Sequence, residues 1–256
     1  WDAAKKVTGG LLPPRNQGNI GTCVSFGTAR AIEYTMCAEI AAGEPEHFRT
    51  VATEPIYGGS RVEIGKGRLG RGDGSVGAWA AQWAKDYGII ERAKHGAYDL
   101  SQYSVTLSRT WGQSGVPENL EGVARLHPIQ AITKITSWEQ AKRALASGYG
   151  ISVSSDQGFA MTRDADGFAR AVGSWSHCMC LSGYQTGIRE GGRIDNSWGA
   201  SAHTGPTGAG NPGPEGFWAD ARTLERMLSY GDSWAFSAFA GFPARPRKSL
   251  DWTSHT

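Results

Sequence analysis

The chain has 256 residues and a formal net charge of +2. Because Lys and Arg nearly balance Asp and Glu, a general nucleic-acid or membrane-surface binder is disfavoured, since those partners usually require a concentrated basic surface. Hydrophobic residues make up 39% of the chain and include ten Trp, eight Tyr and eight Phe, which excludes disorder of the whole chain. No apolar run approaches the roughly 20 residues of a membrane helix, so we expect a soluble protein, with secretion left open because a removed signal segment leaves no trace.

The N-terminal part of the sequence predicts an extended segment followed by a buried helix. The first 22 residues contain turn-forming Gly and Pro, which favour an extended lead-in. Residues 23–42 lack proline and carry few charges, so we expect a largely buried helix that begins at Cys23. Thr22 is the predicted N-cap of this helix, and Gly43 lies where a C-terminal cap is expected.

A loop and two shorter helices are expected next. Residues 58–77 are rich in glycine and predict a loop. Apolar residues at helical spacing predict helices over 77–87 and 138–147. The loop carries four cationic side chains, which we interpret as solvated, with an affinity for acidic substrates as the less favoured alternative: Arg61, Lys66, Arg68 and Arg71.

Strands are expected mainly in the second half of the chain. Residues 150–155, 176–184 and 234–242 alternate in polarity or are apolar, and glycines bound them. Helices first and strands later predict an α+β protein with two lobes. The predicted division is a mainly helical lobe over residues 1–115, a mainly β lobe over 116–242 and a polar C-terminal tail over 243–256.

Cys23 stands where a reactive thiol would be expected. Free N–H groups and the positive dipole end at the first turn of a helix favour an anion, so we predict a lowered pKa for its thiol. His177, in a β-type segment far downstream, is the candidate base. Asn196 could orient that imidazole. The amide of Gln17, six residues before the cysteine, could form an oxyanion hole with the Cys23 N–H.

Three blocks of the sequence resemble the active-site blocks of the papain-like cysteine peptidases. They are NQGNIGTCVSFG at 16–27, SHCMCLSGY at 176–184 and DNSWG at 195–199. The order Gln, Cys, His, Asn is the family's order, and the resemblance covers about residues 10–242, with bacterial-type, disulfide-poor members the most similar. It implies a helical lobe and an antiparallel β-barrel-like lobe with the active-site cleft between them, and N-terminal residues that cross to the other lobe.

A fourth block, residues 72–89, resembles the family segment whose Gly-rich turn pairs with the substrate backbone. This resemblance implies that Gly74 and Ser75 line the cleft, with Val76 and Gly77 near the main specificity pocket.

Two tryptophans complete the implied site. Trp175 is expected to narrow the specificity pocket, and Trp198 to shield the bond between Asn and His from water. The sequence departs from the family pattern at Val24 and Ser176, and a Gly/Pro-rich insertion containing His203 is expected at the rim of the cleft.

The resemblance implies a thiol peptidase. The Cys23 thiolate, paired with His177 as imidazolium, would attack a peptide carbonyl, and His177 would then protonate the leaving amine. No metal or organic cofactor is implied. The expected partner is a peptide or protein substrate, with no nucleic acid and no membrane, and membership of a larger assembly stays open. Two alternatives remain: a catalytically weak or inactive papain-like domain that serves as a binding or structural module, and an acyl transferase that passes the same thioester to an amine.

The remaining cysteines, Cys37, Cys178 and Cys180, are predicted to be packing residues. Cys178 and Cys180 alternate on a strand and so share a face, but two thiols with no second cluster argue against a metal site. Thr22 and Gly72 occupy positions where secreted family members often carry a disulfide. This favours a reducing compartment, cytoplasmic or in a viral or microbial setting.

Overall fold

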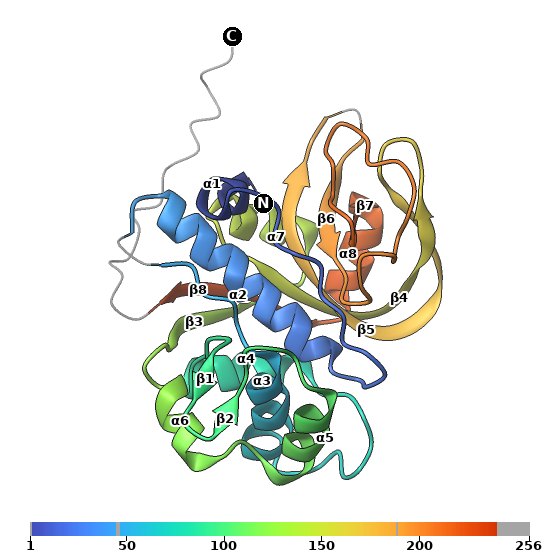
Figure 1. Ribbon diagram of the computed structural model, residues 1–256. Coiled ribbons are helices and arrows are strands. Elements are labelled where there is room, and N and C mark those ends of the chain that lie inside the picture. The colour runs from blue at the N-terminus through green and yellow to red at the C-terminus, as the bar shows by residue number, and fades with distance from the viewer. Residues whose placement is uncertain (1, 45–46, 188, 240–256) are drawn as a thin grey trace.

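A computed structural model of the chain describes residues 2–44, 47–187 and 189–239, so the predicted tail at 243–256 lies outside the described residues. The helix α2 runs between a lower, mainly helical group of elements and an upper group built on a sheet (Figure 1). The elements follow in the order α1 (Asp2–Thr8), α2 (Cys23–Ala41), α3 (Thr53–Gly59), the π-helical turn η1 (Ser60–Ile64), α4 (Gly77–Asp86), β1 (Lys94–His95), β2 (Tyr98–Asp99), α5 (Val105–Ser114), α6 (Glu118–Ala124), β3 (Ile129–Lys134), α7 (Trp138–Ala146), β4 (Ile151–Arg163), β5 (Ala169–Gln185), β6 (Gly191–Asp195), β7 (Gly216–Asp220), α8 (Ala221–Ser229) and β8 (Asp232–Phe239).

The predicted buried helix is α2, and almost all of its residues are buried. Its low charge content allows this, because both lobes pack against it. Gly27 brings the helix close to β5, since a Cβ there would lie 2.8 Å from the Sγ of Cys178. Thr22 occupies the predicted N-cap position, but its side chain makes no capping hydrogen bond, and its hydroxyl lies 3.1 Å from the hydroxyl of Tyr103 instead.

Six strands form one antiparallel sheet in the order β3-β8-β4-β5-β6-β7. The β-barrel-like closure that the resemblance implied is wrong for the described residues, because β3 and β7 are the edges of an open sheet. In this sheet Ser155 pairs with His177, and Cys180 pairs with Asp195. The register therefore brings His177 on β5 near the end of the neighbouring β6, where Asn196 follows.

Two hydrophobic clusters are formed by the described residues, one on each side of the central strands. Cys178 and Cys180 belong to the cluster around α2, whereas Met179 and Leu181 belong to the cluster beneath α7 and α8. This alternation confirms that the two cysteines share a face of the strand. Helix α6, which follows the predicted lobe boundary at residue 115, contributes Leu120 and Ala124 to the cluster around α2.

The predicted extended lead-in and the predicted Gly-rich loop both contain regular structure. The lead-in carries α1, and the Gly-rich segment begins within α3 and η1. The solvated interpretation of Arg61 is also wrong, because its side chain is buried. Its guanidinium donates from Nε to the Gly112 carbonyl at 2.7 Å and from Nη2 to the carbonyls of Gly70 and Gly72 at 2.8 and 2.6 Å. Backbone oxygens of the loop thus replace water around this cation.

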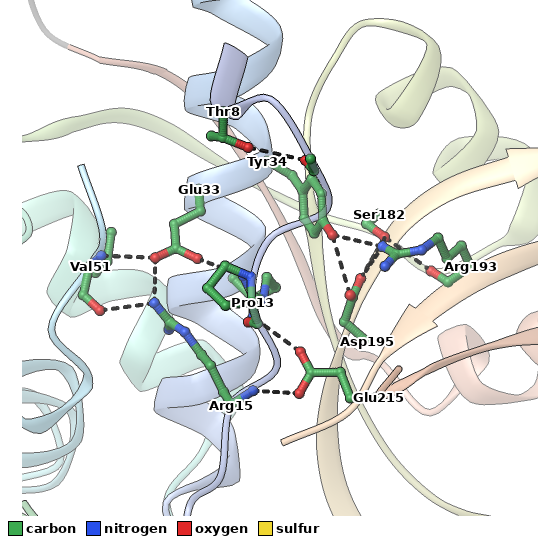
Figure 2. Close-up of polar contacts among 12 residues, drawn as sticks. Thr8, Pro13, Arg15, Glu33, Tyr34, Val51, Ser182, Arg193, Asp195 and Glu215 are labelled. Atoms are coloured by element: carbon green, nitrogen blue, oxygen red, sulfur yellow. Dashed lines mark hydrogen bonds and ion pairs between the residues drawn. The ribbon is translucent and has the colours of Figure 1, made fainter. Parts of the chain in front are cut away.

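A network of buried charges joins α2 to the segments beside it (Figure 2). Glu33 on α2 accepts hydrogen bonds from the Arg15 guanidinium, from Arg30 Nη1 at 3.2 Å and from the Val51 N–H at 2.9 Å. Arg30 Nη2 also lies 3.0 Å from Glu215 Oε1, and the N–H of Arg15 donates to Glu215 Oε2 at 2.6 Å. These contacts tie the N-terminal lead-in, α2 and the segment before β7 together.

The network has a second part on β6. Arg193 Nη1 donates to Asp195 Oδ2 at 2.6 Å, to the Tyr34 hydroxyl at 2.7 Å and to the Ser182 hydroxyl at 2.6 Å. Tyr34 comes from α2 and donates to Asp195 Oδ1 at 3.3 Å. Because Asp195 immediately precedes Asn196, these contacts hold the end of β6 against α2.

No helix within the described residues is long and apolar enough to cross a membrane.

Candidate active site

Cys23 is the first residue of α2, and its side chain is 9% exposed. Burial has the largest effect on its thiol and raises the pKa, whereas the backbone N–H groups of Cys178, Val24 and Cys23 itself lower it. The lowered pKa expected from the helix terminus alone is therefore wrong, because desolvation outweighs the three donors. One of these N–H groups, that of Cys178, belongs to the residue that follows His177.

His177 is held by Asn196. The Nε2 atom of the imidazole lies 2.8 Å from Asn196 Oδ1. The Ser197 N–H donates to the same oxygen at 2.7 Å, which identifies that atom as the acceptor. Nε2 of His177 must then carry a proton, which leaves Nδ1 as the basic atom in the neutral ring. Burial lowers the pKa of His177, and the bond to Asn196 raises it by a smaller amount.

Two indole rings cover the imidazole. The ring centroid of Trp198 lies 4.6 Å from that of His177 and 4.3 Å from that of Trp175. The rings of Trp175 and His177 are 5.8 Å apart and nearly parallel. Both tryptophans are half-buried, whereas His177 and Asn196 are buried, and the shielding role of Trp198 stays a prediction. The role of Trp175 at the specificity pocket stays a prediction.

Gln17 reaches the same region through backbone pairing. Its N–H donates to the Ser197 carbonyl at 2.8 Å, next to a bridge between Asn16 and Trp198. The Ser197 hydroxyl donates to Gln17 Oε1 at 2.7 Å, and Gln17 Nε2 donates to the Ile20 carbonyl at 2.9 Å. The amide nitrogen Nε2 carries two hydrogens, and the bond to Ile20 uses one of them.

Comparison with solved structures identifies the architecture. The chain is similar to xylellain, a cysteine protease from Xylella fastidiosa, with a TM-score of 0.62 and 16% sequence identity over 91% of this chain and 89% of that one. It is also similar to the digestive procathepsin L 3 of Tenebrio molitor larval midgut, with a TM-score of 0.56 and 13% identity over 89% of this chain and 67% of that one. The chain has the papain-like fold.

The papain-like fold confirms the predicted α+β class and the two lobes. At these sequence identities the likeness concerns the fold. A scan against models of known protein families finds no match, and a sequence comparison with curated proteins finds none either.

The Gly-rich segment of this papain-like fold approaches the start of α2. Gly74 has a φ of +91°, and a Cβ on Gly21 would lie 2.8 Å from the Gly74 nitrogen. The carbonyl of Gly74 accepts a hydrogen bond from Arg61, and the Ser75 hydroxyl lies 2.7 Å from that of Ser60. The turn is thus held close to the segment that leads into Cys23.

Val76 and Gly77 lie at the beginning of α4. Val76 is half-buried and precedes the helix, and the N–H groups of Gly77 and Ala78 both donate to the carboxylate of Asp232 at 2.7 Å. A Cβ on Gly77 would lie 2.7 Å from Asp232 Oδ2, so glycine is needed for this approach. The sequence analysis missed Asp232, and no local pattern could reveal it because 155 residues separate it from Gly77.

His203 is the other missed residue. It was expected in an insertion at the rim of the cleft, but its side chain is fully buried, with Nε2 2.9 Å from Asn196 Nδ2. In the sequence, only its position seven residues after Asn196 could have indicated that His203 lies near that residue.

The described residues contain no group of three or more His, Cys, Asp or Glu that could hold a metal ion. Cys37, Cys178 and Cys180 are free and buried, and burial raises the pKa of each thiol. Packing explains these three cysteines, and Cys23 differs from them by standing at the first turn of α2.

Proposed function

We propose that the protein is a cysteine-type peptidase that hydrolyses peptide bonds through a thioester on Cys23. The observation that carries the proposal is the hydrogen bond between His177 and Asn196, next to Cys178, whose backbone N–H lowers the pKa of the Cys23 thiol. The papain-like fold supports it, because both structural relatives are named as proteases or their precursors.

The proposed reaction begins with proton transfer from Cys23 Sγ to Nδ1 of His177. In the resting site, burial raises the pKa of the thiol and lowers that of the imidazole, so the neutral pair is favoured. The thiolate would be stabilised by the three surrounding N–H groups, and the imidazolium by the oxygen of Asn196. Burial therefore sets the cost of this proton transfer, and the hydrogen bonds offset part of that cost.

In the acylation step, the thiolate adds to the carbonyl carbon of the peptide. The oxyanion accepts hydrogen bonds from the Cys23 N–H and from the second Nε2 hydrogen of Gln17. The imidazolium of His177 donates its Nδ1 proton to the amine as the C–N bond breaks. Water, deprotonated by the same Nδ1, then hydrolyses the thioester and restores the thiol.

The substrate-binding residues follow from the same proposal. The backbone of Gly74 and Ser75 would pair with an extended peptide, and Val76 and Gly77 would border the specificity pocket. The ordering of this turn by Arg61 supports the assignment, because a preformed surface lowers the entropic cost of binding.

The test compares Cys23→Ala with Cys37→Ala, a buried cysteine on the same helix, using a library of fluorogenic peptides. Cleavage should be abolished by the first substitution and retained by the second. Undiminished cleavage by Cys23→Ala would overturn the proposal. If the wild-type protein cleaves nothing and iodoacetamide labels Cys23 no faster than Cys37, the domain is an inactive binding module. An amide product formed with an added amine would identify a transferase.

A further inference from the structure

We propose that His203 is a positioning residue that sets the orientation of the Asn196 amide and, through it, the protonated nitrogen of His177. The inference rests on the proposed function, since it concerns the same site. His203 lies in the segment between β6 and β7, which the sequence analysis interpreted as an insertion at the rim of the cleft. Its backbone has a φ of 53°, a conformation that non-glycine residues rarely adopt.

The surroundings of His203 determine the role of each ring nitrogen. Nδ1 lies 2.9 Å from the carbonyl oxygen of Ala160, which can only accept, so Nδ1 carries a hydrogen. In the neutral ring Nε2 then has a lone pair, and it lies 2.9 Å from Asn196 Nδ2, which can only donate. The ring also packs on Phe217, with centroids 4.3 Å apart.

The donor and acceptor roles of the His203 nitrogens also determine which nitrogen of the catalytic imidazole, His177, carries the hydrogen. With its Nδ2 bound to His203, Asn196 presents Oδ1 to His177, whose Nε2 must donate. The basic Nδ1 of His177 is then available to Cys23. Ala160, His203, Asn196 and His177 thus form a series of hydrogen bonds in which each donor is determined by the bond before it. The series begins at the Ala160 carbonyl oxygen, which can only accept.

The series requires a neutral His203. Burial is the main cause that lowers the pKa of His203 to about 4, and the charges of Arg163 on β4 and His177 on β5 lower it further, against the opposing effect of the Ala160 carbonyl. A protonated His203 ring would direct an N–H at the Asn196 NH₂ group, which can only donate, and the Asn196 amide would have to turn over. Its nitrogen would then face His177, and Nδ1 of His177 would become the protonated atom.

A competing explanation is that the Ser197 N–H alone orients Asn196 and that His203 only fills space. The variants His203→Leu and His203→Gln separate the two explanations. Leu fills the space with an apolar side chain but cannot accept a hydrogen bond from Asn196 Nδ2, whereas Gln can accept it through Oε1. The matched control is His95→Leu, because His95 also bonds a backbone carbonyl, with its Nε2 2.8 Å from the Glu91 oxygen, but belongs to the two-stranded β1–β2 sheet, which is separate from the sheet that carries His177.

Three measurements test the proposal: kcat and KM for a cleaved peptide, the rate of Cys23 alkylation by iodoacetamide against pH, and the ¹⁵N shifts of the histidine ring nitrogens. We expect His203→Leu to lower kcat and the neutral-pH alkylation rate about tenfold to a hundredfold with little change in KM, as for loss of one buried hydrogen bond. His203→Gln should recover most of both, and His95→Leu should match the wild type.

Unchanged alkylation in a folded His203→Leu, or His203→Gln no better than His203→Leu, would overturn the proposal. If neither variant folds, the wild-type spectrum decides: His203 protonated on Nε2, or on both nitrogens, at pH 7 contradicts the assignment. If the wild type cleaves no peptide while alkylation and ring shifts behave as expected, the proposed function fails and the positioning role stands.

Discussion

Glu33 offers the sharpest test of how the buried charges stabilise the fold. Its side chain is 1% exposed and accepts from two guanidinium groups and one backbone N–H. The substitution Glu33→Gln keeps the shape and removes the negative charge. Arg15 is already poorly compensated, because burial lowers its pKa to about 10 and its Nη1 has no hydrogen-bond partner among the described residues. Glu33 is the strongest influence raising that pKa.

Removing one member of a buried ion pair costs about 3–5 kcal/mol, because the partner charge stays buried. Gln can still accept from the Val51 N–H, so we expect the lower end, about 3 kcal/mol, in the free energy of unfolding. For a chain of this size that loss corresponds to a fall in Tm of about 6–12 °C. The matched control is Glu139→Gln, whose side chain is 68% exposed and pairs with Lys142. The free energy of unfolding of Glu139→Gln should fall by less than about 1 kcal/mol.

Urea-induced unfolding followed by tryptophan fluorescence, together with calorimetry, measures both losses. The double variant Glu33→Gln with Arg15→Met should be more stable than Glu33→Gln alone, because the uncompensated cation is gone. Equal losses for Glu33→Gln and Glu139→Gln, or a double variant that is less stable than Glu33→Gln, would refute this account of the network.

Two further predictions concern Gln17 and Glu215. Gln17→Ala should lower kcat about 10²–10³-fold with little change in KM. The control Gln82→Ala, at a half-buried glutamine of α4 that bonds Asp86, should not lower it; an equal effect of both in peptide-cleavage assays would contradict the oxyanion role. Burial raises the pKa of Glu215 to about 7 from 4.5. Because the folded state favours the protonated form, the stabilising contribution is complete below pH 4.5 and is lost as pH rises through about 7. Relative to Glu215→Gln, the wild type should lose up to about 3 kcal/mol over that range; parallel curves of Tm against pH would contradict this.

The parts of the fold that the sequence predicted are those determined by local pattern. Helix α2 follows from a proline-free stretch with few charges, and α7 from its apolar spacing, with the Ser137 hydroxyl accepting from the Gln140 N–H. Strand β8 was expected over 234–242 and is described over Asp232–Phe239, with residues 240–242 outside the described part. In each case the deciding residues lie within the element itself.

The features that were missed depend on residues distant in sequence. Arg61 lies in a stretch that is otherwise typical of a solvated loop, and only folding brings the Gly112 carbonyl to it. The direction of the pKa shift of Cys23 was wrong for the same reason: the helix terminus is local, but desolvation arises from both lobes. His203 likewise meets Ala160 from 43 residues away, so its role is invisible in a motif.

The contacts of Arg61 have a consequence for variation in the Gly-rich turn. The guanidinium binds carbonyl oxygens of Gly70, Gly72 and Gly74, which any amino acid would also supply. The anchoring therefore depends on the spacing of these carbonyls along the chain and on the positive φ of Gly70 and Gly74, which favours glycine at those two positions. Insertions or deletions between Ile64 and Gly74 should disturb the turn more than substitutions at its exposed positions that lack a positive φ, so those side chains can change while the path of the backbone is kept.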